Sequence, residues 1–238
     1  MISGLMILPF TVRPKAYIKM IRENRKLVVN ITVLQTLLNY SLFYLGMNLV
    51  PGALGAIIVG SQPLVTAVVA AMMHEEEKLT KHKIITIIAG ISGVVLISAG
   101  RQAFRMGTAL ELLGVTMILG ANIATALSNV LVSLKGRGIH PLVLSSTSLG
   151  VGGLILYMVS LLTETRIPVH KPAEYWVVLI WLSFMSAFAF SLWFKLLQRP
   201  GVKVSELNLW KFIIPVVGAV LSWILVPGEH PEWLTVTG

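Results

Sequence analysis

Two amino-acid types are missing from this chain of 238 residues. It contains no cysteine and no aspartate, so all ten acidic residues are glutamate. Without cysteine, disulfides, thiol catalysis and cysteine-ligated metals are excluded. Without aspartate, an aspartyl-phosphate pump, an intramembrane aspartyl protease and Asp-rich diphosphate sites are excluded. Phosphate-binding loops, nucleophile elbows, dinucleotide fingerprints and zinc-ligand spacings are absent too, so we predict no enzyme, no cofactor, no metal site and no transport driven by bound ATP.

Charge is also scarce. Charged residues make up 12% of the chain and apolar residues 55%, with a mean hydropathy of +0.83. Soluble domains carry about 25% charged residues, so this chain has too little polar material to cover a globule. Its apolar residues fall in blocks of bilayer length, roughly 20 residues, and do not alternate as barrel strands would. The sequence therefore predicts an all-α, polytopic membrane helical bundle in a lipid bilayer.

Hydropathy predicts about seven full spans and two partial ones. The full spans lie near residues 28–49, 51–73, 84–100, 109–132, 142–162, 175–197 and 205–226, and the partial spans at 1–12 and 233–238. The net charge of +9 is explained by sidedness, because fourteen Lys and Arg residues fall in the connections on one side and four on the other. The positive-inside rule makes the first side cytoplasmic. We predict a multi-pass protein of the plasma or inner membrane with no nucleic-acid partner.

Several short features recur in the same order about 150 residues apart. The pairs are YSLFY at 40–44 with FSLWF at 190–194, GLMIL at 4–8 with GLILY at 153–157, Pro51-Gly52 with Pro200-Gly201, and the Pro63-to-Glu77 interval with the Pro215-to-Glu229 interval. Five spans separate a feature from its copy, and because five is odd the second copy would be upside down in the membrane. We predict two inverted-topology repeats of five helices, 1–100 and 101–238, incomplete at both ends of an expected ten spans.

The motif P-L-V-T-A-V-V-A…E-x-K-L-T at 63–80, followed by G-I-S-G-V-V-L-I at 90–97, resembles the EamA-like branch of the drug/metabolite transporter superfamily. The stretch from Pro215 to Glu229 looks like the corresponding part of that family's second domain, and residues 120–138 are similar to the helix that opens it. The resemblance implies two inverted five-helix domains that carry small metabolites across a cell membrane.

Polar residues inside the predicted spans are candidates for a substrate site. Gln35 and Asn39 lie on one face of span 28–49 together with two threonines, and Asn122 and Asn129 lie similarly on span 109–132. Such residues either hydrogen-bond neighbouring helices or line a polar cavity. For a single residue the first interpretation is favoured; for the set, a polar cavity is the better account.

Lys211 lies inside span 205–226 and is expected either to hold a carboxylate or phosphate of the substrate or to extend to the cytoplasmic surface. Proline lacks an N–H, so Pro63 and Pro215 predict helix kinks at matching places in the two repeats. We expect the glutamates at 75–77 in a solvated turn, with Thr80 as N-cap of the next helix.

These features favour a secondary transporter of small metabolites, an anionic metabolite being the one that Lys211 would hold. It would work by alternating access between inverted halves. The alternative is a membrane remnant or assembly partner that does not transport, which is favoured by the incomplete ends.

Overall fold

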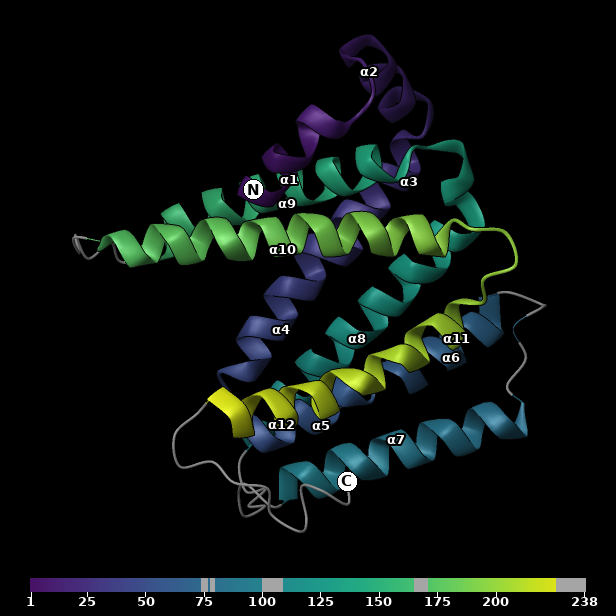
Figure 1. Cartoon of the computed structure of the whole chain (residues 1–238), viewed down its shortest axis with the longest axis vertical. Coiled ribbons are helices and arrows are strands. Elements are labelled where there is room, and N and C mark those ends of the chain that lie inside the picture. Colours follow the sequence, from purple (N-terminus) through teal and green to yellow (C-terminus); the bar gives the residue numbers. More distant parts are fainter. Residues whose placement is uncertain (74–76, 78–79, 100–108, 165–170, 226–238) are drawn as a thin grey trace. The chain divides into compact units, whose positions relative to one another are not determined.

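A computed structural model of the chain describes residues 1–73, 77, 80–99, 109–164 and 171–225. Every regular element in these ranges is a helix, which confirms the predicted helical fold (Figure 1). The chain divides into two compact units, each built from two separate stretches. Unit 1 comprises Met1–Leu38 and Leu131–Val202, and unit 2 comprises Asn39–Val130 and Lys203–Gly238.

Within the described residues, five helical segments are long and apolar enough to cross a membrane. They are Arg25–Met47, Leu54–Met73, Ala109–Gly138, Pro141–Thr163 and Ala173–Leu197. Each coincides with a predicted span. The two other predicted full spans also contain helices, α7 (Lys81–Ala99) and the run of α11 (Val204–Leu209), η4 (Trp210–Phe212) and α12 (Ile213–Leu225). The count of seven spans stays a prediction, and the partial span at 233–238 lies outside the described residues.

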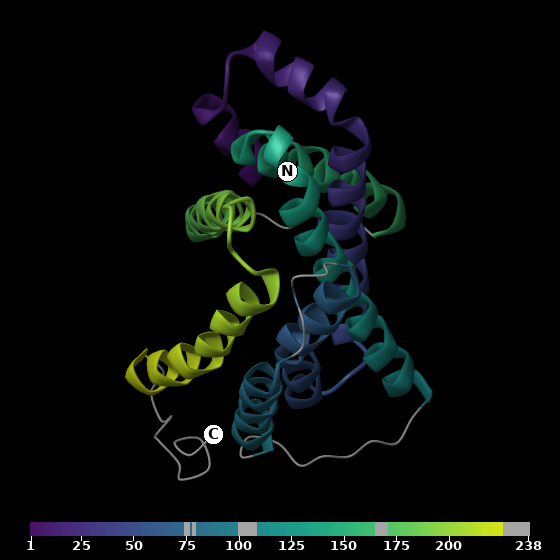
Figure 2. The ribbon, with the colours of Figure 1, turned by 90° about the vertical axis from the view of Figure 1, so that its right-hand side faces the viewer.

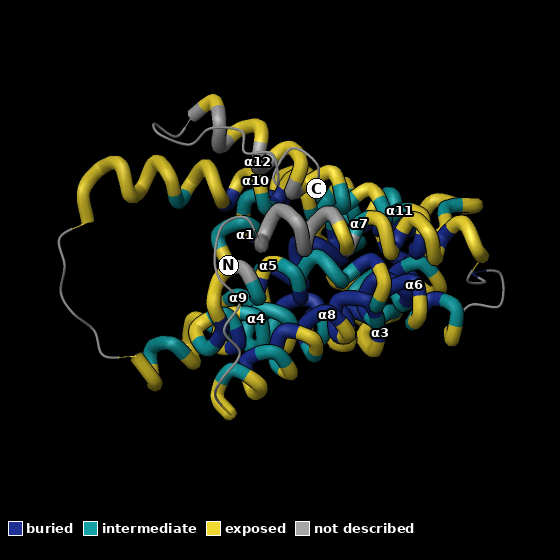
Figure 3. The backbone as a smooth tube through the Cα atoms, turned by 90° about the horizontal axis from the view of Figure 1, so that it is seen from below, coloured by how far each residue is buried: buried dark blue, intermediate teal, exposed yellow. Residues whose placement is uncertain are grey.

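Unit 1 is built around one long helix, α9 (Pro141–Thr163). The elements packed against it are α1 (Ile2–Ile7), η1 (Leu8–Phe10), α2 (Pro14–Glu23), α3 (Arg25–Ile31), the π-helical segment η2 (Thr32–Leu38) and α10 (Ala173–Leu197). Pro14 and Pro141 each occupy the first turn of a helix, where the missing N–H costs nothing. The outer side of α10 carries exposed aromatic and aliphatic side chains, as expected of a helix that faces lipid (Figure 3).

Glycines let two elements approach α9 closely. A Cβ on Gly152 would lie 2.7 Å from the Cβ of Thr36 in η2, and one on Gly4 of α1 would overlap the backbone of Gly150. Thr36 uses this proximity to hydrogen-bond Ser148, with 3.0 Å between the two hydroxyl oxygens. Small residues on α9 therefore replace the large apolar contacts that join helices in water-soluble cores.

Unit 2 contains α4 (Asn39–Met47), α5 (Gly52–Gly60), α6 (Gln62–Met73), α7, most of α8 (Ala109–Lys135), and α11, η4 and α12. Helix α5 packs on α7, and α11 packs on α6. Val50, Ile58 and Ile118 form a buried cluster. The predicted N-cap of α7 is confirmed, because the Lys83 backbone N–H donates to Thr80 Oγ1 across 3.4 Å.

Irregular backbone interrupts the interior of three helical runs in the described part of the chain. The run from Arg25 to Met47 is π-helical over Thr32–Leu38, the run through Pro63 is interrupted at Ser61 between α5 and α6, and the run through Pro215 has a 3₁₀ turn at Trp210–Phe212. Such irregular turns release backbone groups from the regular α-helical pattern. They lie beside the predicted proline positions, and the kinks themselves stay a prediction.

Candidate functional site

Four of the five predicted site residues, Asn39, Asn122, Asn129 and Lys211, lie in unit 2, and Gln35 lies in unit 1. The three asparagines have different partners along α8. Thr125 Oγ1 donates to Asn39 Oδ1 on α4 across 2.9 Å, and Asn129 Nδ2 donates to Asn208 Oδ1 on α11 across 3.5 Å. Asn129 and Asn208 are fully buried. The polar face of α8 therefore connects several helices, and its substrate role stays a prediction.

Asn122 is directed at the interruption before Pro63. Its Nδ2 donates to the Ile58 carbonyl oxygen across 2.7 Å, and the Ser61 hydroxyl donates to the same oxygen across 2.6 Å. Regular α-helical geometry predicts that Pro63 frees the Val59 carbonyl. The two side-chain donors instead bond to the Ile58 carbonyl oxygen. Helix α5 ends at Gly60, and the turn at Ser61 shifts the hydrogen-bonding pattern by one residue.

Lys211 is also directed at this place in unit 2. Its Nζ donates to Gln62 Oε1 across 3.0 Å, and Gln62 is the first residue of α6, next to Pro63. A cation, an amide and a helix interruption thus lie together, which is the kind of polar group that membrane transporters place at broken helices. The substrate role of Lys211 stays a prediction. Pro215 lies two residues into α12.

The predicted polar face of residues 32–39 is divided between the two units. Thr32, Gln35 and Thr36 are buried in unit 1, whereas Asn39 begins α4 in unit 2. The prediction assumed regular α-helical spacing, and the π-helical turn changes the direction of the residues after Thr32. Gln35 Oε1 is buried and has no hydrogen-bond partner among the residues described.

Glu77 was missed as a site residue, and its expected solvated turn is wrong. The residue is 3% exposed. Its carboxylate accepts the backbone N–H of Val204 across 2.5 Å, that of Ser205 across 2.9 Å, and the Ser205 hydroxyl. A negative charge thus meets the N-terminal N–H groups of α11, where the helix dipole is positive. Glu75 and Glu76 lie outside the described residues.

Lys83 completes this network from α7. Its Nζ donates to Ser205 Oγ across 2.6 Å and lies 3.8 Å from Glu206 Oε1. Glu206 also lies 3.4 Å from Lys203 Nζ. The repeated interval, from Pro63 to Glu77 and from Pro215 to Glu229, is the sequence signal that could have identified Glu77. Glu229 is outside the described part of the chain.

The chain resembles several known proteins. The sequence profile of the EamA-like transporter family matches residues 1–99 and 112–238. The uncharacterized transporter YyaM of Bacillus subtilis is 25% identical over 187 residues, which cover 77% of this chain and 60% of that protein. An uncharacterized transporter in the sor 3′ region of Acidianus ambivalens is 25% identical over 223 residues, which cover 93% of this chain and 80% of that protein.

Among the solved structures, one crystal structure illustrates the shared fold. It superposes with a TM-score of 0.79 at 16% sequence identity and covers 99% of this chain and 80% of the solved one. At that identity the likeness concerns the fold alone. The chain spans less than two thirds of the length of YyaM and of a second Bacillus subtilis relative, the uncharacterized transporter YetK.

Proposed function

The chain belongs to the EamA-like transporter family, and from that premise we propose that it acts in secondary transport of small metabolites across the cell membrane, by alternating access between inverted halves. Membership confirms the resemblance drawn from the motifs at 63–80 and 90–97. It also makes the chain a helical membrane protein of a transporter family rather than of an enzyme family. The mechanism and the solute are the parts that we propose.

The observation that carries the proposal is the direction of two helices within unit 2. Gln62, at the start of α6, contacts Lys211, whereas Glu77, just beyond the end of α6, contacts Val204 and Ser205. From residue 62 to residue 77 the chain therefore contacts residues of falling number, from 211 down to 204 and 205. Helix α6, which carries Pro63, and the run α11–η4–α12, which carries Pro215, are antiparallel (Figure 1). Inverted repeats require this arrangement, and parallel helices would have excluded it.

A reciprocal contact in unit 1 supports the same relation. The paired segments GLMIL at 4–8 and GLILY at 153–157 define a shift of 149 residues, which relates Gly4 to Gly153 and Met1 to Gly150. A Cβ on Gly4 would overlap the Gly150 backbone, and a Cβ on Gly153 would overlap the Met1 backbone. Adding or subtracting 149 therefore turns the Gly4–Gly150 contact into the Gly153–Met1 contact. A two-fold relation between α1 and α9 produces such a pair of contacts.

For the solute we propose a small anion. Lys211 offers a positive charge beside Gln62, and the adjacent Ile58 carbonyl and Asn122 amide offer further polar groups. A carboxylate or phosphate is the natural partner of an ammonium group in a desolvated site. Placing a lysine inside a membrane costs about 2.5–3.5 kcal/mol of insertion free energy. An anionic partner would offset part of this cost.

The test is uptake into proteoliposomes that contain the purified full chain, measured for a panel of radiolabelled carboxylates, phosphates, cations and neutral solutes. We expect saturable uptake and counterflow of at least one anion. Lys211→Met should lower that uptake about 10- to 100-fold, the loss of one hydrogen bond to a charged group. Lys195→Met, an exposed lysine near the end of α10, is the matched control.

Uptake that rises linearly and never saturates would contradict alternating access. Equal uptake by both lysine variants would remove Lys211 from the site. If no solute moves although the chain is folded, the alternative of an assembly partner is favoured.

A further inference from the structure

The segment that contains α2 carries an unusual concentration of positive charge. Six basic residues and one glutamate, Glu23, lie between Arg13 and Lys26. Within α2, Lys15, Lys19 and Arg22 follow the spacing i, i+4, i+7, which places them on one face of the helix. All three are exposed. A helix with one basic face and one apolar face is typical of segments that lie on a membrane surface.

The other face of α2 is attached to unit 1. The Tyr17 hydroxyl lies 3.0 Å from Ser146 Oγ and 2.8 Å from Thr147 Oγ1, both on α9. Asn24 Nδ2, just after α2, donates to the Gly138 carbonyl oxygen across 3.4 Å. Helix α9 begins at Pro141, so Tyr17 meets it five to six residues from its start, about 9 Å along the axis.

The chain changes direction between α2 and α3, so α2 does not simply extend the span that follows (Figure 2). That span, Arg25–Met47, is long and apolar enough to cross the membrane. Helix α2 therefore lies at the end of a membrane-length helix, at an angle to it. The positive-inside rule places this end at the cytoplasmic leaflet.

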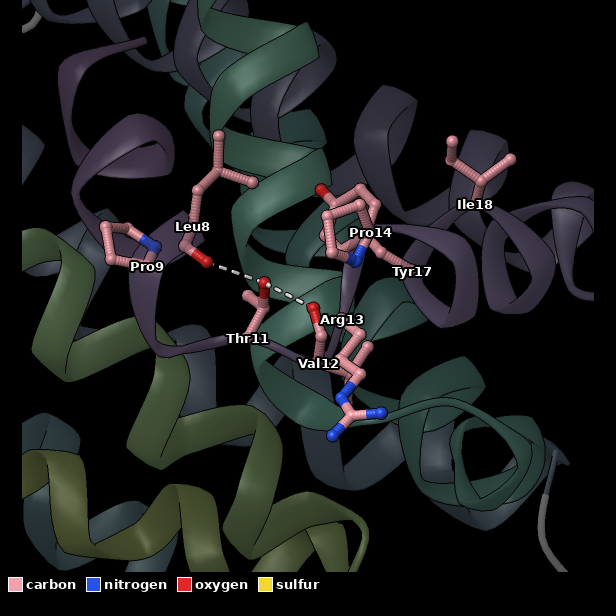
Figure 4. Close-up of a pocket in the computed structure, with 8 residues that line it drawn as sticks. All are labelled: Leu8, Pro9, Thr11, Val12, Arg13, Pro14, Tyr17 and Ile18. Carbon is pink, nitrogen blue, oxygen red and sulfur yellow. Dashed lines mark hydrogen bonds between the residues drawn. The ribbon is translucent and has the colours of Figure 1, made fainter.

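An open pocket of about 570 Å³ lies beside α2 (Figure 4). Its wall is mostly apolar, with Leu8, Pro9, Val12 and Ile18, and it also includes Arg13. Ile18 is 65% exposed and the neighbouring Phe10 is 77% exposed. An apolar wall that includes one guanidinium, next to the basic face of α2, is complementary to a molecule with a hydrocarbon part and a negative head.

We propose that α2 and this pocket bind anionic phospholipids of the cytoplasmic leaflet. The phosphate lies among Arg13, Lys15 and Lys19, and part of an acyl chain lies along Leu8 and Ile18. Charge complementarity favours this occupant, since a neutral lipid would gain nothing from the basic face, whereas anionic lipids attract each basic residue near the surface. The binding anchors α2 and does not depend on which solute is transported.

The absence of cysteine makes a direct test feasible, because Ile18→Cys provides a single attachment point for a donor fluorophore. The labelled full chain is placed in phosphatidylcholine vesicles that contain a trace of acyl-labelled phosphatidylglycerol or, in a parallel sample, of acyl-labelled phosphatidylcholine. Energy transfer then reports which lipid gathers at position 18. We expect about fivefold enrichment of phosphatidylglycerol, the factor that corresponds to about 1 kcal/mol for one basic residue near the surface.

Lys15→Gln/Lys19→Gln should lower this enrichment to less than about twofold, and so should about 1 M salt, where the Debye length is about 3 Å. Lys195→Gln/Arg199→Gln, in the last turn of α10 and just after its end, removes the same charge and should leave the enrichment in place. Three results would overturn the proposal. They are equal energy transfer with the two lipids, an enrichment that persists after the loss of Lys15 and Lys19, and low energy transfer with both lipids. The last result would indicate that a protein, and not lipid, covers this face.

Discussion

Replacing Glu77 with glutamine is expected to destabilise the protein although the side chain keeps its size. The carboxylate accepts two backbone N–H groups and one hydroxyl at the start of α11. In the glutamine variant one of the two oxygens becomes an NH₂ group, which faces donors instead of accepting from them. A hydrogen bond to a charged group contributes about 1.5–3 kcal/mol, and a carboxylate at a partly buried helix N-terminus up to about 2 kcal/mol. These contributions overlap, so we expect a loss of about 2–3 kcal/mol.

Lys83 adds to the cost, since its side chain is 9% exposed and its ammonium bonds to the same Ser205 hydroxyl. Removing one partner of a buried charged network leaves the other without compensation. For a chain of 150–250 residues, 1 kcal/mol corresponds to about 2–4 °C in the unfolding temperature. The expected decrease is therefore about 4–12 °C, measured by tryptophan fluorescence of the purified chain in detergent.

Glu206→Gln is the matched control, because the same change is made in the same network at an exposed position. The Glu206 side chain is 54% exposed, and its lysine partners lie at 3.4 and 3.8 Å. Exposed ion pairs contribute about 0–1 kcal/mol, so the decrease should stay below about 3–4 °C. Equal decreases in the two variants, or no change in Glu77→Gln, would refute the assignment of Glu77 as a buried helix cap.

Four further substitutions, one of them a control, test the packing within each unit. Gly46→Ala should lower the unfolding temperature by several degrees, because the new Cβ would lie 2.7 Å from Ile118 Cγ1 and overpacking costs about 1–3 kcal/mol; Gly52→Ala, with open space around it, should change it little. Asn122→Leu should cost about 1 kcal/mol by removing the donor to the Ile58 carbonyl, and it should lower solute uptake if the interruption before Pro63 belongs to the site. Thr36→Val should cost only about 0.6 kcal/mol, the average for a hydrogen bond between membrane helices, and a large loss would show that more than this bond is broken.

The sequence by itself determined the helical membrane fold, the positions of five membrane-length helices and the family. These depend on local properties, since the length and apolarity of a block decide whether it can cross a bilayer as a helix. The N-cap at Thr80 was predictable for the same reason, because a cap involves residues three positions apart. The repeated interval between Pro63 and Glu77 was visible too, but the sequence did not indicate that Glu77 caps another helix.

Tertiary structure alone decided what the polar residues do. Glu77 was expected in water and is instead buried, because its carboxylate packs on the start of α11, a helix that lies far away in the sequence. The π-helical segment Thr32–Leu38 departs from the regular spacing on which the predicted polar face of residues 32–39 depends. The contact between Lys211 and Gln62 likewise joins residues far apart in the chain. Hydrogen bonds and ion pairs between helices depend on which helices become neighbours. The apolar pattern of a membrane helix indicates only that lipid or other helices surround it, and does not identify those helices.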